Sequence, residues 1–91
     1  MKVPNTRARS LVENRQAFKG SNTFAEHRGV DLETYVVYSY GYHFPIFVYK
    51  SGHWYENQEK YSVTTSKQMS QLRPAGVELE PKTTQELKNL I

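Results

Sequence analysis

The sequence has 91 residues, enough for one domain, and with 37% apolar and 13% aromatic residues it is too aromatic for a disordered chain. Cysteine is absent, which excludes a disulfide framework and a thiolate metal site. No apolar run approaches the length of a secretory signal or a membrane span, so we expect no membrane partner and a cytoplasmic location, while the net charge of +3 excludes strongly acidic nucleic-acid mimicry.

The chain begins with a basic segment. We expect residues 1–9 to form a loose basic arm outside a single α+β domain over residues 10–91. Ser10 and Glu13 have the spacing of a helix-capping box, which predicts a short helix that begins there and ends near residue 17. The polar run "KGSNTF" that follows predicts a turn.

The middle of the chain predicts three antiparallel strands. Residues 34–40, 46–50 and 53–57 are dense in β-branched and aromatic side chains, which favour a pleated surface. The dipeptide Ser51-Gly52 predicts a two-residue turn between the second and third strands. The expected partners across this turn are Lys50 with His53, Tyr49 with Trp54, and Val48 with Tyr55.

The side chains on each face depend on the register between the first two strands. We expect Tyr40 opposite Pro45, although a slip by one residue would exchange the two faces. In the expected register one face carries Val36, Tyr38, Phe47, Tyr49 and Trp54, and the other carries Tyr35, Val37, Ile46, Val48 and Tyr55. Both faces are apolar and aromatic, whereas a sheet with one solvated face would alternate with polar residues.

A helix is expected directly after the sheet. Thr65 and Gln68 have the spacing of a capping box, and the helix that starts there places Met69 and Leu72 on one face. Pro74 ends this helix, because proline lacks the amide hydrogen that a further turn needs.

The clearest helix lies at the end of the chain. Residues 75–81, "AGVELEP", are expected to be extended or linking. Thr83 and Glu86 form another capping box and predict a helix over residues 84–91. Its apolar stripe is Leu87, Leu90 and Ile91. The expected fold class is therefore α+β, with a small three-stranded antiparallel meander and short flanking helices, one of them near the C-terminus.

The expected helices carry too few apolar side chains to cover both faces of the sheet. Monomeric proteins seldom leave a large apolar patch exposed. We therefore expect one face to form the core and the other to meet a partner. The alternatives for this partner are a second copy of the chain in a homodimer, a nucleic acid and a protein.

The sequence contains no recognisable catalytic or metal-binding pattern. His27, His43 and His53 lack the spacing of a metal-binding pair, and no GxSxG, Walker, GxGxxG or HExxH motif occurs. The many serine and threonine hydroxyls are explained as helix caps and turn bonds. We therefore expect no catalytic residue, no metal, no cofactor and no enzymatic activity.

Basic residues flank the aromatic block, and this favours a nucleic-acid interface. Residues 1–28 carry six Lys or Arg against two Glu, and residues 58–77 carry three against one. Proteins that bind single strands combine aromatic stacking platforms with a basic groove. The candidate binding residues are Tyr42, His43, Trp54, Tyr55, Lys60, Tyr61, Lys67 and Arg73. Protein interfaces also favour Tyr, Trp and Arg, so a protein interface or a core role for the tyrosines stays open.

Two stretches, "YVVYSYGYHFPIFVY" and "WYENQEKYSVTTSKQMSQLRP", resemble an uncharacterised family of small proteins that phages and plasmids encode. The likeness runs over residues 18–74, with "FKGSNTFAE" at its start. The resemblance supplies no activity and implies only an accessory gene of a mobile element, acting in the host cytoplasm when a phage carries it.

Together, the residues and the resemblance predict a non-enzymatic accessory binding protein of a phage or plasmid. Nucleic acid is the expected partner, bound through a basic and aromatic surface. The alternative is a protein-binding module that inhibits or redirects a host factor, for example a defence factor.

Overall fold

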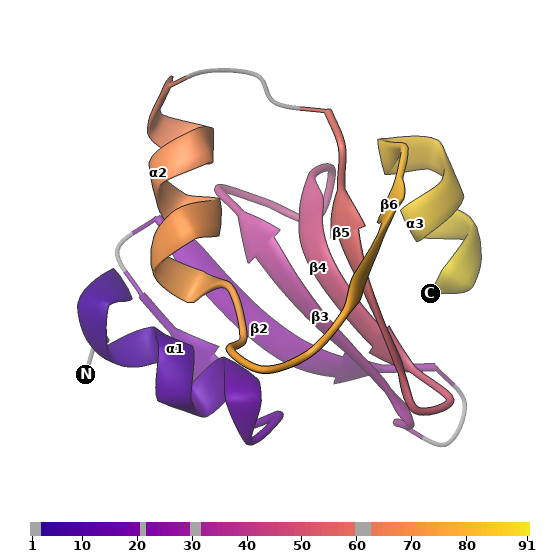
Figure 1. Cartoon of the computed structure of the whole chain (residues 1–91), viewed down its shortest axis with the longest axis horizontal. Coiled ribbons are helices and arrows are strands. Elements are labelled where there is room, and N and C mark those ends of the chain that lie inside the picture. The colour runs from indigo at the N-terminus through magenta and orange to yellow at the C-terminus, as the bar shows by residue number, and fades with distance from the viewer. Residues whose placement is uncertain (1–2, 21, 30–31, 60–62) are drawn as a thin grey trace.

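The computed structural model describes residues 3–20, 22–29, 32–59 and 63–91, which form three helices and one mixed six-stranded sheet (Figure 1). In chain order the elements are α1 (Asn5–Glu13), β1 (Phe18–Lys19), β2 (Thr23–Arg28), β3 (Thr34–Ser39), β4 (Pro45–Lys50), β5 (His53–Asn57), α2 (Val63–Leu72), β6 (Leu79–Lys82) and α3 (Thr84–Leu90). The strands lie side by side in chain order, antiparallel except for the parallel pair β5 and β6. The α+β class is confirmed, and the expected three-stranded meander is the β3–β4–β5 centre of a larger sheet.

The hairpin of β4 and β5 matches the prediction residue for residue. Lys50 lies opposite His53, Tyr49 opposite Trp54 and Val48 opposite Tyr55. Ser51 and Gly52 both have positive φ angles, 53° and 80°. Positive φ at both central residues is the geometry whose twist suits a two-residue hairpin turn.

The predicted register between β3 and β4 is wrong by one residue along residues 35–37 and by two residues at Pro45. Tyr49 lies opposite Tyr35 rather than Val36, and Pro45 lies opposite Tyr38 rather than Tyr40. The error changes from two residues to one at a β-bulge, because the register shifts between Val37 and Tyr38. The faces of β3 are therefore exchanged. One cluster holds Tyr35, Val37, Ile46, Phe47 and Trp54 with Tyr49 packed against it, and the other holds Val36, Tyr38 and Val48 with Tyr55 packed against it.

The segment before β3 contains two strands that were not predicted. The expected turn over "KGSNTF" shortens, because Lys19 belongs to β1 and Thr23 begins β2. The Gly20 amide donates to the Thr23 carbonyl at 2.7 Å and closes the connection. Along β2 the side chains alternate, with Thr23 and Ala25 buried in the core.

The first helix begins earlier than predicted. Residues 5–9 belong to α1, so the expected loose arm over residues 1–9 is wrong for that part, and the expected start at Ser10 falls inside the helix. Pro4 precedes the first turn, where its missing amide hydrogen costs nothing. Ala8 and Val12, one turn apart, are both fully buried and fix the helix to the sheet.

Helices α1 and α2 cover what we call the first face of the sheet (Figure 1). Met69 and Leu72 share the buried side of α2, as predicted, and pack with Ala8 and Val12 of α1. The helix starts at Val63, two residues before its expected cap Thr65. A buried hydrogen bond from the Ser39 hydroxyl to the Gln68 side chain ties α2 to the end of β3.

Helix α3 lies on the opposite side, which we call the second face, and packs on β4 and β5 (Figure 1). The predicted capping box is present, because the Glu86 amide donates to Thr83 Oγ1 at 3.2 Å and the Thr83 amide to Glu86 Oε1 at 2.9 Å. Leu87 is fully buried against Val48. Lys50 Nζ donates to the Leu90 carbonyl at 2.7 Å and places a positive charge at the helix C-terminus.

The segment that was expected to be extended or linking ends in strand β6. Residues Leu79 to Lys82 pair with β5 in parallel, and the Gln58 amide extends the ladder to the Lys82 carbonyl at 2.8 Å. Pro81 is compatible with this position because β6 is the last strand of the sheet.

Candidate functional site

The predicted aromatic residues separate into exposed and buried ones. Tyr42 and His43 are exposed in the loop between β3 and β4. Trp54 is 6% exposed and packs against Tyr35 and Tyr49, with ring centroids 6.2 and 5.0 Å away. A ring enclosed in this way cannot stack on a base, so the stacking role predicted for Trp54 is corrected to a core role. Tyr55 is half-buried on the second face, beside the Lys82 ammonium.

The predicted basic residues are also distributed over different places. Lys67 is exposed on the outer side of α2. Arg73 follows α2, and its Nη2 lies 2.6 Å from Glu56 Oε2, so its charge is already paired within the protein. Lys60 and Tyr61 lie outside the described residues. The six predicted residues that the structure describes therefore do not form one site.

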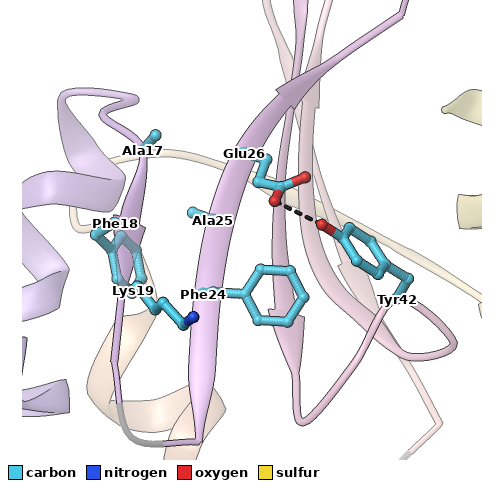
Figure 2. A pocket seen from close by; sticks show the side chains of 7 residues that line it. All are labelled: Ala17, Phe18, Lys19, Phe24, Ala25, Glu26 and Tyr42. Carbon is cyan, nitrogen blue, oxygen red and sulfur yellow. Dashed lines mark hydrogen bonds between the residues drawn. The ribbon is translucent and has the colours of Figure 1, made fainter. Parts of the chain in front are cut away.

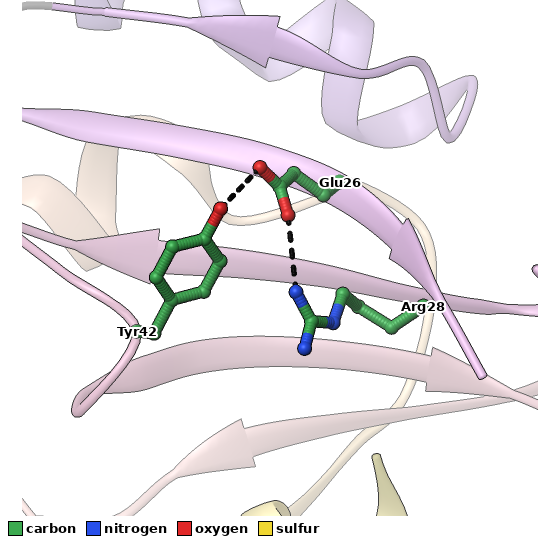
Figure 3. Close-up of polar contacts among 3 residues, drawn as sticks. All are labelled: Glu26, Arg28 and Tyr42. Atoms are coloured by element: carbon green, nitrogen blue, oxygen red, sulfur yellow. Dashed lines mark hydrogen bonds and ion pairs between the residues drawn. The ribbon is translucent and has the colours of Figure 1, made fainter.

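The structure instead gathers polar and aromatic side chains around Tyr42, over β2 and β3 on the second face (Figure 3). Alternate residues of β2 point to that face, which brings Phe24, Glu26 and Arg28 into one row. Lys19 of β1 lies opposite Phe24 in the register of the first hairpin. We call Lys19, Phe24, Glu26, Arg28, Tyr40 and Tyr42 the Tyr42 surface.

Tyr42 is held in place from three sides although it is 55% exposed. Its hydroxyl donates to Glu26 Oε2 at 2.6 Å, and its ring meets Phe24 and Tyr38 edge-on, with centroids 5.1 Å from each. The Arg28 guanidinium lies 5.2 Å from the centre of the same ring, a cation–π distance. The ring is therefore an exposed surface with a fixed orientation.

The loop that carries Tyr42 folds back tightly onto the sheet. The Gly41 amide donates to the Ser39 carbonyl at 2.8 Å, and the Phe44 amide to the Gly41 carbonyl at 3.3 Å. Phe44 is buried and anchors the end of the loop in the core. Tyr40 has a φ of 65°, which is uncommon for a non-glycine residue, and yet its side chain is 64% exposed.

The charges of the Tyr42 surface are mixed. Arg28 Nη1 lies 3.3 Å from Glu26 Oε1, so one carboxylate serves both Arg28 and Tyr42. The hydrogen bond to Glu26 is the main reason that the pKa of Tyr42 is raised above its ordinary value. Each Glu26 oxygen accepts one hydrogen bond in this network, and a carboxylate oxygen can accept two.

A hollow of about 530 Å³ opens on this surface (Figure 2). Its walls are Ala17, Phe18, Lys19, Phe24, Ala25, Glu26 and Tyr42. A second hollow of about 220 Å³ shares Lys19 and Phe24 with it and extends the surface to Tyr40. The arrangement can hold a flat group against aromatic rings, with a carboxylate and an ammonium group at its edge.

Other chemistries find less support in the parts of the chain that the structure describes. There, no group of three or more His, Cys, Asp or Glu side chains is placed to hold a metal ion. Across those same residues, no helix has the length and apolarity needed to cross a membrane.

Most of the Tyr42 surface was not predicted from the sequence, because strand β2 was not predicted. Phe24, Glu26 and Arg28 become neighbours only when "TFAEHR" is read as a strand whose alternate side chains share a face. The signal that could have found them is the pairing of this stretch with the apolar strand at residues 34–39.

Comparisons with known proteins add no assignment. No protein-family model matches the chain, and searches of curated proteins and of solved structures gave no match either. The resemblance to small phage and plasmid proteins therefore stays a prediction.

The expected homodimer also stays a prediction. Helices lie on both faces of the sheet, which leaves less open surface than the sequence suggested. Among the described residues the exposed large apolar side chains are Leu32, Tyr40, Tyr42 and Val77. Two of these belong to the Tyr42 surface, so a dimer formed there would compete with any other partner.

Proposed function

We propose that the chain is a non-enzymatic accessory binding protein that holds single-stranded nucleic acid on the Tyr42 surface. The observation that carries the proposal is the pair of exposed tyrosines, Tyr40 and Tyr42, on a loop next to Lys19. Most aromatic side chains of β3 and β4 are buried, but these two are not. Exposed rings beside cationic side chains are the usual means of binding single strands.

Pre-orientation of Tyr42 supports stacking. A ring that is already fixed by Glu26, Phe24 and Tyr38 loses little conformational freedom when a base packs on it. The strained backbone at Tyr40 fits the same role, because uncommon φ angles cluster at binding sites.

The helices of the first face, on the other side of the sheet, also carry basic side chains. Arg7, Arg9 and Lys67 are exposed on α1 and α2. The one acidic residue described on these helices, Glu13, uses its carboxylate to accept from the Ala75 amide at 2.8 Å. Gln68, next to Lys67, reaches the end of β3 at Ser39, immediately before Tyr40. A strand that stacks on Tyr40 and continues over the end of β3 would reach the basic side chains of the first face.

A second candidate function is binding of a host protein at the same place. What favours it is the apolar character of the hollow walls, together with Glu26, which lowers the positive potential beside Lys19. Protein interfaces use tyrosine and apolar pockets in the same way. In this case the partner would be a protein side chain that fills the hollow.

The two functions separate in a salt titration. Labelled single- and double-stranded oligonucleotides are titrated with the wild type at low and at physiological salt. We expect the single strand to bind more tightly and its affinity to fall steeply as salt rises, because bound counterions are released. Lys67→Ala should reduce the salt slope by about 1, and Lys88→Ala on α3 is the matched control that should not.

Two results would contradict the nucleic-acid function. One is the absence of oligonucleotide binding even at low salt, which would leave the protein-binding function as the better account. The other is an equal effect of Lys67→Ala and Lys88→Ala, which would show that only the net charge matters.

A further inference from the structure

Glu26 keeps unused hydrogen-bonding capacity at the wall of the larger hollow. Its Oε1 is engaged by Arg28 and its Oε2 by Tyr42, and its side chain is still 38% exposed. An ionised carboxylate offers about four acceptor positions, so each Glu26 oxygen has the capacity for one further hydrogen bond. The Phe24 and Tyr42 rings stand next to it (Figure 2).

We propose, on the basis of the function above, that this hollow receives one guanine base of the single strand and that Glu26 is the residue that selects it. The base packs against the ring of Phe24 or Tyr42. Its N1–H and 2-amino groups donate to the two oxygens of the Glu26 carboxylate. Lys19, at the edge of the hollow, is placed to meet a neighbouring phosphate.

The selectivity follows from the donors and acceptors of the bases. Guanine alone presents two adjacent N–H donors on its Watson–Crick edge. Adenine and cytosine present one amino group beside an acceptor nitrogen, and thymine and uracil present one N–H between two carbonyls. An acceptor that faces a carboxylate is repelled, so a group that only accepts favours the base with two donors.

The other features of the hollow fit a base. Its volume of about 530 Å³ lies within the usual range of small-molecule pockets, about 300–1,000 Å³. Phe24 and Tyr42 meet at 74°, so a flat ligand can lie parallel to one ring and touch the other with its edge. Arg28 contacts Glu26 Oε1 and Tyr42 contacts Glu26 Oε2, so the two contacts together fix the orientation of the carboxylate.

The test compares single strands that differ at one position. Oligo(dT), the same strand with one dG and the same strand with one deoxyinosine are titrated with the wild type, Glu26→Gln and Glu33→Gln. Inosine lacks the 2-amino group of guanine. Glutamine keeps an oxygen that can accept from Tyr42, and Glu33→Gln removes the same charge from an exposed residue outside the hollow.

We expect the wild type and Glu33→Gln to bind the dG strand about tenfold more tightly than oligo(dT), with the inosine strand close to oligo(dT). Glu26→Gln should lose most of this preference, which is measured as the ratio of the affinities of the same variant for the dG strand and for oligo(dT). Binding of oligo(dT) without a dG preference would overturn the guanine site alone, and so would a preference that survives in Glu26→Gln. Failure to bind any of the strands would overturn the proposed function as well.

Discussion

The two halves of the second face are built from similar strands but have different surfaces. Over β4 and β5, helix α3 closes the sheet and buries Leu87 and Val48 completely. Over β2 and β3 the cover consists of single side chains, Phe24 and Tyr42, with the Glu26–Arg28 ion pair beside them. Tyr38 is only 2% exposed, yet the rings that shield it are partly exposed themselves.

This difference shows how one aromatic sheet can provide both a core and an exposed aromatic surface. Where helix α3 packs on the sheet, the strand side chains beneath it form part of the core. Where only the loop between β3 and β4 covers the sheet, aromatic side chains remain at the surface and are held by hydrogen bonds and ring contacts. The four tyrosines of "YVVYSYGYHF" divide accordingly, because Tyr35 and Tyr38 are buried and Tyr40 and Tyr42 are exposed.

The largest expected effect compares the closed half with the open half. Leu87→Ala leaves a cavity under α3 and should lower the free energy of unfolding by roughly 2–5 kcal/mol. Tyr42→Ala removes a larger side chain but should cost only about 1 kcal/mol, the size of its edge-on ring contacts. Urea unfolding of both variants measures the difference, and Leu32→Ala, at a position 63% exposed, serves as the neutral control. Equal losses for Leu87→Ala and Tyr42→Ala would contradict the distinction between the halves.

A smaller effect concerns the cap that holds α3 in place. Hydrogen bonds with the amide and side chain of Thr83 lower the pKa of Glu86 below its ordinary value. A carboxylate with a lowered pKa stabilises the folded state fully above the ordinary glutamate pKa of about 4.3, and this contribution is lost as the pH falls through the lowered value. Glu86→Gln should therefore flatten the stability of the protein between about pH 5 and pH 2.

The control for this prediction is Gln85→Ala, an exposed change in the same helix turn. It should leave the pH dependence of the free energy of unfolding unchanged. An identical acid profile for the wild type and Glu86→Gln would show that the cap contributes nothing measurable to α3.

Local signals predicted the centre and the end of the fold. The Ser51-Gly52 turn set the pairing of β4 with β5, since both residues can adopt positive φ. The Thr83–Glu86 capping box and the apolar stripe after it predicted α3. In both cases the decisive contacts are close in sequence, so a short stretch carries enough information.

The parts that sequence reasoning missed depend on contacts between distant residues. Strand β6 forms by parallel pairing with β5, from which the whole of α2 separates it in the sequence. Pro81 also made a strand difficult to predict there, because proline is uncommon inside strands. The register of β3 with β4 depends on a β-bulge, and no residue type in the sequence indicates where this bulge lies. In the candidate site, Tyr42 and His43 were predicted to be binding residues and are exposed in the loop. Phe24 and Glu26 could not be predicted, because they share a face only once residues 23–28 form strand β2.

The most direct test of the account is a map of where a single strand touches the protein. Backbone amide signals of nitrogen-labelled protein are followed by NMR while a short dG-containing strand is added. We predict the largest changes in β2 and in residues 40–43, smaller ones near Lys67, and none in α3. Changes concentrated in α3 and β6, or spread evenly over the molecule, would contradict the claim that the open half of the second face is the binding site.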